Sequence, residues 1–133
     1  MAGIESNLVT ARIATKAFTT QLIANGHTLV ADEPLDLGGK NLGPTPGDYL
    51  RMALASCTAI TLRMYANRKN WDLKEIQVDV NTSQADGVTL FTRNIELMGT
   101  LDEEQRNRLL QVANACPVHK ALSGTIQIST ALR

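Results

Sequence analysis

One stretch of the sequence limits the possible folds more than any other, because residues 49–66 are helix-prone and apolar on nearly every side. Arg51 and Arg63 are the only charged residues in it, among alanine, leucine, methionine and isoleucine. A helix of this kind must be buried on more than one side. A chain of 133 residues has few other helices to offer, so we expect a single domain, 1–133, whose long central helix is covered in part by a second copy of the chain.

The residues before this stretch mark where the helix begins. Thr45 suits the N-cap position, Pro46 suits the first helical position, and Asp48 places a negative charge in the first turn. Residues 32–46 hold three prolines and two adjacent glycines, which predicts a loop ahead of the helix. The polar residues 67–72 predict its end.

Alternating apolar and polar residues predict strands on both sides of the helix. We expect them at 8–15, 17–24 and His27–Ala31 before the helix, and at 74–82, 88–99 and 125–130 after it. Asn25-Gly26 favours a tight hairpin turn, because both residues adopt positive φ at low cost, and Asp86-Gly87 marks a second turn. Within 88–99 the apolar face changes phase, which predicts a β-bulge near 92–94.

Two shorter helices complete the pattern. Thr100 and Glu103 resemble a capping box for a helix that reaches Asn114 and buries a stripe that contains Leu109. Pro117 begins a short helix that Gly124 ends. The element order is therefore βββ-α-ββ-αα-β, which is an α+β fold.

Composition excludes several classes of function. The 13 basic and 13 acidic residues give no net charge, and the five aromatic residues are too few for a base-stacking surface, so we expect neither nucleic-acid nor membrane binding. No apolar run approaches the roughly 20 residues that a membrane span needs. Residues 1–10 contain Glu5 and lack the pattern of a secretory signal, so we expect a cytoplasmic protein.

The two cysteines are the residues with the clearest chemical potential. In the cytosol a cysteine pair is more often free, redox-active or metal-bound than a structural disulfide. Cys57 lies in the apolar helix, where a cysteine is often only a small core residue. Cys116 precedes Pro117 at the start of a short helix, where free N–H groups lower the pKa of a thiol, and His119 and Lys120 could add positive charge.

A metal site is an alternative interpretation of the same residues. Cys116 and His119 have a Cys-x-x-His spacing, and Cys57 and His27 could complete four zinc ligands. A single such pair without a second clustered pair is a weak signal, so we expect no metal.

Several motifs together resemble the OsmC/Ohr family of osmotically induced and organic-hydroperoxide-resistance proteins. The similar segments are Gly43-Pro44-Thr45-Pro46, the helix around Cys57-Thr58-Ala59, and Cys116-Pro117-Val118-His119-Lys120. The residues from Gly26-His27 to Asp32-Glu33-Pro34, followed by Gly38-Gly39, are similar to one OsmC-like subgroup. The likeness covers nearly the whole chain in element order.

This resemblance implies an intertwined homodimer that acts as a thiol peroxidase on small hydrophobic hydroperoxides. Cys57 would attack the peroxide as a thiolate and become a sulfenic acid. Cys116 would then condense with it to form a disulfide, which a dithiol such as a lipoyl protein would reduce by exchange. The family needs no cofactor and no metal for this chemistry.

The sequence departs from the family at the residues that support the reactive thiolate. Family members place a glutamate after the helix-opening proline, where this chain has Gly47, and an arginine in the N-terminal hairpin, where this chain has none between Arg12 and Arg51. The candidates for supporting residues are His27, Asp48, Arg51 and His119. A thiol buried without such support has a raised pKa and reacts slowly. The alternative function is therefore a non-enzymatic or weakly active OsmC-like stress protein that senses redox state or binds a ligand.

Overall fold

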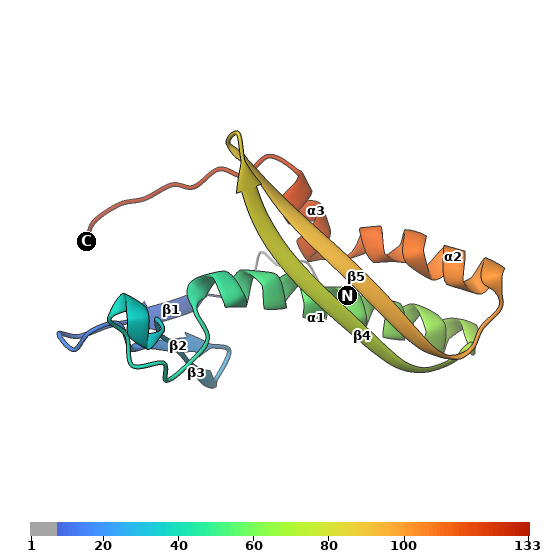
Figure 1. Cartoon of the computed structure of the whole chain (residues 1–133), viewed down its shortest axis with the longest axis horizontal. Coiled ribbons are helices and arrows are strands. Elements are labelled where there is room, and N and C mark those ends of the chain that lie inside the picture. The colour runs from blue at the N-terminus through green and yellow to red at the C-terminus, as the bar shows by residue number, and fades with distance from the viewer. Residues whose placement is uncertain (1–7) are drawn as a thin grey trace. The chain divides into compact units, whose positions relative to one another are not determined.

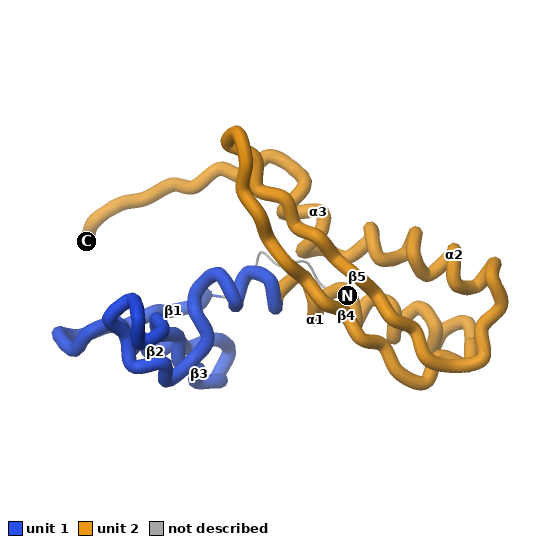
Figure 2. Tube along the Cα trace, viewed as in Figure 1, with its two compact units in different colours: residues 1–52 blue, residues 53–133 orange. Residues whose placement is uncertain are grey.

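The computed structural model describes residues 8–133. The prediction that residues 1–10 carry no secretory signal therefore falls mostly outside the described residues. The chain divides into two compact units, one ending at Met52 and the other beginning at Ala53 (Figure 2). Each unit has its own sheet. Within residues 8–133, none of the helices is both long and apolar enough to cross a lipid bilayer.

The first unit is a three-stranded antiparallel sheet. Its strands are β1 (Val9–Arg12), β2 (Thr20–Ala24) and β3 (His27–Ala31), in the order β1-β2-β3. The predicted turn is confirmed, because Asn25 and Gly26 have φ of 49° and 81°. The first two strands are shorter than expected, because residues 15–18 form a bend and turn in which Ala17 has a positive φ of 29°.

A buried carboxylate organises the loop after β3, which includes a short 3₁₀ helix, η1 (Leu35–Leu37). Asp32 accepts hydrogen bonds from the Thr19 hydroxyl (2.8 Å) and from the backbone amides of Glu33, Lys40 and Leu42 (2.7, 3.4 and 3.3 Å). Burial opposes ionisation, but these donors outweigh it and lower the pKa of Asp32. The carboxylate thereby ties the two ends of the loop together.

The long helix, α1 (Pro46–Lys69), begins where the sequence predicts. The Thr45 hydroxyl accepts from the Asp48 amide (3.1 Å), and the Asp48 carboxylate accepts from the Thr45 amide (3.0 Å), so each residue caps the other. The Tyr49 hydroxyl donates to the Val30 carbonyl (2.7 Å), which attaches the first turn to β3. The helix runs three residues past the expected end, and Asn70 closes it with a φ of 56°.

The second unit packs helices on a long β-hairpin (Figure 1). The hairpin consists of β4 (Asp72–Ala85) and β5 (Val88–Thr100), joined at Asp86 and Gly87, whose positive φ values confirm the predicted turn. Three short helices follow, α2 (Glu103–Val112), η2 (Ala113–Ala115) and α3 (Pro117–Ser123). The core between them is formed by Leu62, Ala66, Leu73, Leu109, Val112 and Ala113.

The expected β-bulge at 92–94 is wrong, and the reason bears on function. Pairing is regular from Ala85 opposite Val88 to Glu75 opposite Met98, and the register shifts only at Lys74. The apolar phase changes because Leu90 faces outward and is exposed, whereas the half-buried Arg93 takes an inward position between inward apolar residues. A polar residue on the inner face therefore imitates a bulge in the sequence pattern.

Two further expectations need correction. The capping box of α2 pairs Asp102 with Gln105 (2.7 and 2.9 Å), because Thr100 still belongs to β5. Residues 125–130 form no strand, and Ile126 and Ile128 are exposed. A strand needs a neighbouring edge that accepts its backbone hydrogen bonds, and none of the described strands pairs with this segment.

One side of α1 is buried within the single chain and the other is not. Leu54, Cys57, Thr58, Leu62 and Ala66 are buried against the hairpin and the short helices. Ile60 and Met64, one turn apart on the same side of the helix, are 50% and 47% exposed. The sequence predicts apolar residues on nearly every side of α1, and the single chain buries only one of these sides.

Candidate active site

Helices α1 and α3 bring the two cysteines into one buried apolar cluster. Cys57 is 6% exposed and Cys116 is fully buried, and both are free thiols. They share the cluster with Leu54, and the partly buried side chains of Val80, Phe91, Val118 and Leu122 pack against it. Two thiols that are distant in the sequence are thus neighbours in the second unit.

The start of α3 supplies backbone donors to both sulfurs. Cys116 is the N-cap residue of α3, with Pro117 at the first helical position as predicted. The amide of His119 donates to Cys116 Sγ (3.4 Å), and the amide of Val118 hydrogen-bonds to Cys57. These amides have no partner within the helix at its first turn, so the sulfurs take the place of absent carbonyls.

Cys57 is held as a neutral thiol. Burial raises the pKa of Cys57, and Cys116 raises it further through a side-chain hydrogen bond and through charge repulsion. The Val118 amide and the Thr61 hydroxyl lower the pKa, but they do not outweigh burial. The raised pKa agrees with the sequence-based expectation for a thiol that is buried without a charged partner.

This raised pKa predicts a strong pH dependence of thiol reactivity. The thiolate is the reactive form, so its fraction grows about tenfold for each pH unit below the pKa. We expect alkylation of Cys57 by iodoacetamide, followed by mass spectrometry of its peptide, to accelerate continuously from pH 7 to pH 9. A plateau below pH 8 would contradict the direction of the shift.

Thr61 is placed to support the Cys57 thiolate. It lies one turn further along α1, and its hydroxyl oxygen is buried with no hydrogen-bond partner of ordinary geometry among the described residues. A thiolate at Cys57 is the acceptor that this hydroxyl can serve. Sequence analysis missed Thr61, although its position four residues after Cys57 is a signal that was present in the sequence.

Replacing Thr61 with valine is therefore expected to raise the pKa of Cys57 further. Loss of a hydrogen bond to a charged group predicts alkylation about tenfold slower at pH 8. Thr61→Ser keeps the hydroxyl and serves as the matched control, with a rate near that of the unchanged protein. Equal rates for the valine and serine variants would show that the hydroxyl does not serve the thiolate.

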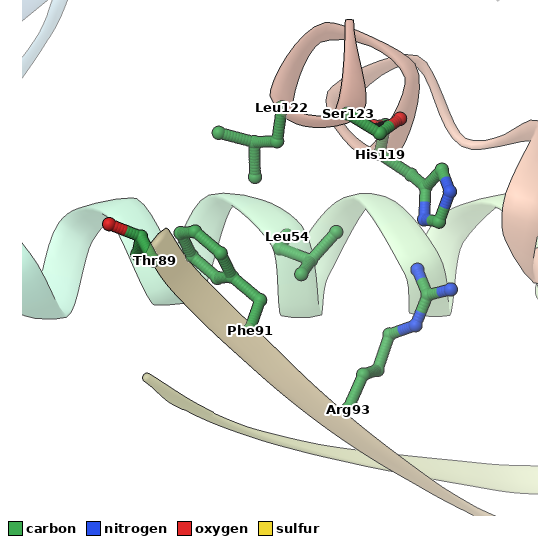
Figure 3. Close-up of a pocket in the computed structure, with 7 residues that line it drawn as sticks. All are labelled: Leu54, Thr89, Phe91, Arg93, His119, Leu122 and Ser123. Atoms are coloured by element: carbon green, nitrogen blue, oxygen red, sulfur yellow. Dashed lines mark hydrogen bonds between the residues drawn. The ribbon is translucent and has the colours of Figure 1, made fainter. Parts of the chain in front are cut away.

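A pocket of about 420 Å³, whose lining residues are drawn in Figure 3, shares walls with the thiol cluster. Leu54, Phe91 and Leu122 belong both to the walls of the pocket and to the packing around the thiols. The remaining walls are Thr89, Arg93, His119 and Ser123. The pocket therefore has an apolar side next to the sulfurs and a polar side formed by Arg93 and His119.

Arg93 is the functional candidate that the sequence analysis missed. Its guanidinium donates to the Thr58 hydroxyl (3.0 Å), to the Ala113 carbonyl (3.4 Å) and to the Asn114 side-chain oxygen (3.0 Å). Thr58 follows Cys57 directly, and Asn114 precedes Cys116 by two residues. Its signal in the sequence is the interrupted apolar phase of β5, a pattern that also predicts a bulge.

His119 does not supply the positive charge that the sequence suggested. Its side chain points toward the Arg93 guanidinium on the polar side of the pocket (Figure 3). Burial lowers the pKa of His119, and repulsion by Arg93 lowers it further, so the imidazole is neutral at pH 7. The charge at this end of the pocket is carried by Arg93.

The other expected supporting residues lie in the first unit. His27 is exposed at the start of β3, and Asp48 forms an ion pair with Arg51 (2.7 Å) inside the first turns of α1. Within residues 8–133, no three histidine, cysteine, aspartate or glutamate side chains are grouped to hold a metal ion. The zinc interpretation therefore has no ligand cluster in the described chain.

The fold of this chain is similar to that of several solved structures. An OsmC-like protein from Mycoplasma pneumoniae matches with a TM-score of 0.77 and 18% identity, over 91% of this chain and 89% of that one. An organic hydroperoxide resistance protein OsmC from Legionella pneumophila matches with a TM-score of 0.67 and 17% identity, over 92% and 93%. The organic hydroperoxide resistance protein OhrB of Bacillus subtilis matches with a TM-score of 0.62 and 22% identity, over 92% and 93%.

At identities this low, the matches show a shared fold, and the function has to be argued from the residues of this chain. No curated protein matches the sequence. The family model described as OsmC-like protein matches residues 38–131, which include α1, the hairpin and both cysteines. This match agrees with the motifs around Cys57 and Cys116, and the protein belongs to the OsmC/Ohr family of OsmC-like proteins.

Proposed function

We propose that the protein is a cytoplasmic, homodimeric thiol peroxidase that reduces small hydrophobic hydroperoxides. The observation that carries this proposal is the meeting of Cys57 and Cys116, as free thiols, in one buried cluster beside an apolar pocket. Solved structures of the same fold include proteins named for organic hydroperoxide resistance. Two neighbouring thiols and an apolar recess are what a dithiol peroxidase requires.

The reaction begins with the Cys57 thiolate. It attacks one oxygen of the hydroperoxide, the O–O bond breaks, and the leaving alkoxide takes a proton and departs as an alcohol. The sulfur of Cys57 is then a sulfenic acid. The Cys116 sulfur attacks it, a disulfide forms and water leaves, and an external dithiol reduces the disulfide by exchange. No cofactor enters these steps.

The chain offers its own support for the thiolate in place of the family's charged residues. The Val118 amide and the Thr61 hydroxyl are the two donors that lower the pKa of Cys57. Both are neutral dipoles, so they stabilise a developing charge without adding a buried ion. We expect slower peroxide reduction than in relatives with an arginine at the sulfur, because burial still dominates.

The test is a stoichiometric reaction of the reduced protein with cumene hydroperoxide. One equivalent of peroxide should be consumed per chain, both thiols should disappear together, and the peptide masses should identify a Cys57–Cys116 disulfide. Dithiothreitol should then restore both thiols and allow further turnover. Peroxide that persists, or thiols that remain titratable, would rule the proposal out.

A second candidate function follows from the raised pKa of Cys57, which favours slow oxidation. The protein would then be a redox sensor or a ligand-binding stress protein that uses the same pocket. This second function predicts negligible peroxide turnover, together with a higher melting temperature of the protein when a hydrophobic ligand fills the pocket. Peroxide turnover without such thermal stabilisation favours the peroxidase.

A further inference from the structure

Arg93 connects the two chain segments that carry the thiols. It reaches from the inner face of β5 to Thr58 on α1 and to Ala113 and Asn114 in η2. Thr58 is fully buried. Its hydroxyl accepts from Arg93 and donates to the Leu54 carbonyl (2.7 Å), so it links Arg93 to the backbone of α1. One side chain thus joins the turn of α1 that holds Cys57 to the segment that ends at Cys116.

The guanidinium is suited to this position by its shape. It presents five N–H donors in a planar fork, so it can bond three oxygens of two segments at once. Among the described residues, no carboxylate forms an ion pair with Arg93, so these oxygen contacts are what hold the group in place. An ammonium group at this position would keep the charge and lose the fork.

A disulfide forms only when the two Cα atoms lie about 4.4–6.8 Å apart and the side chains face each other. The rate at which Cys116 captures an oxidised Cys57 therefore depends on how narrowly the two segments are held. We propose that Arg93 is a positioning residue that keeps the Cys116 segment in register with Cys57 for disulfide formation. This inference rests on the proposed function for its biological meaning, but the geometry can be tested without peroxide.

The step that Arg93 assists competes with a damaging one. When Cys116 attacks the sulfenic acid, the S–O bond breaks, the S–S bond forms and water leaves. When another hydroperoxide reaches the sulfenic acid before Cys116 does, it transfers an oxygen atom to the sulfur. The sulfenic acid becomes a sulfinic acid, and the peroxide leaves as an alcohol. A loosened Cys116 segment shifts the outcome from the first step to the second.

The primary experiment measures the Cys57–Cys116 pair in buffers of reduced and oxidised dithiothreitol. We expect Arg93→Lys to lower the equilibrium constant for disulfide formation about tenfold, because the fork is lost while the charge remains. Thr58→Val, which removes the acceptor, should act in the same direction, and Thr58→Ser should restore the equilibrium constant. Arg106→Lys is the matched control, because the Arg106 guanidinium donates only to the carbonyl of Leu97 in β5 (3.3 Å) among the described side-chain contacts.

A second experiment adds excess cumene hydroperoxide and measures the products at Cys57 by mass spectrometry. Arg93→Lys should raise the ratio of sulfinic acid to disulfide about tenfold, while the alkylation rate of Cys57 in the folded, reduced variant stays near that of the unchanged protein. An unchanged equilibrium constant in the dithiothreitol buffers would overturn the role of Arg93. If the unchanged protein forms the disulfide in those buffers but not with peroxide, the proposed function fails while Arg93 is still judged by the buffer series.

Discussion

Replacing Cys57 with serine is expected to reduce peroxide turnover by about a thousandfold or more, because a hydroxyl group cannot accept the peroxide oxygen as a thiolate does. The substitution changes one atom of a side chain that is 6% exposed, so the variant should keep the fold. The measurement is the rate of cumene hydroperoxide loss with dithiothreitol as reductant. Full turnover in Cys57→Ser would exclude Cys57 as the peroxidatic residue.

Cys116→Ser separates the first step of the reaction from the second. Cys57 should still consume one equivalent of peroxide, but without Cys116 no intramolecular disulfide can form. The sulfenic acid should therefore be trapped by dimedone and, at higher peroxide, advance to sulfinic acid. If Cys116→Ser cycles as cleanly as the unchanged protein, Cys116 does not resolve the sulfenic acid and the two-thiol mechanism is wrong.

The second large effect concerns assembly, and it is expected at the uncovered side of α1. Ile60 and Met64 are half-exposed there within the single chain. If a second copy covers this side, Ile60→Glu would bury an unpaired carboxylate at the interface, which costs several kcal/mol. We expect the unchanged protein to be a dimer by light scattering and Ile60→Glu to be a monomer at the same concentration.

Gln111→Glu is the matched control for this substitution. It adds the same charge at an exposed polar position on another helix, α2, and preserves an oxygen for the hydrogen bond from Arg108 (3.2 Å). It should remain a dimer and keep its melting temperature. A monomeric unchanged protein, or an equally dimeric Ile60→Glu variant, would mean that another surface or none mediates assembly.

The sequence predicted most of the local structure that neighbouring residues decide, although it placed the N-cap of α2 two residues too early. The cap formed by Thr45 and Asp48, the turns at Asn25-Gly26 and Asp86-Gly87, and the start of α3 at Pro117 all occur as expected. Each depends on φ preferences and on hydrogen bonds within a few residues, which the sequence specifies directly. The motifs around the two cysteines likewise placed the chain in its family before any contact was known.

The errors arose where a distant partner decides the outcome. Residues 125–130 have the alternation of a strand, but a strand exists only when another edge accepts its hydrogen bonds. The phase change in β5 suggested a bulge because an arginine was not expected on the inner face. Its acceptors, Thr58 and Asn114, lie 35 and 21 residues away, so no local pattern could identify them.

The amino-acid sequence by itself determined the starts of α1 and α3, the two hairpin turns, the α+β class and the two thiols as the candidate chemistry, because these depend on short-range stereochemistry and on residue type. Only the tertiary structure decided that Cys57 and Cys116 share one buried cluster, that Val118 and Thr61 are the donors that lower the pKa of Cys57, and that Arg93 bridges the two segments. Those properties depend on burial and on contacts between remote segments, which exist only after the chain has folded.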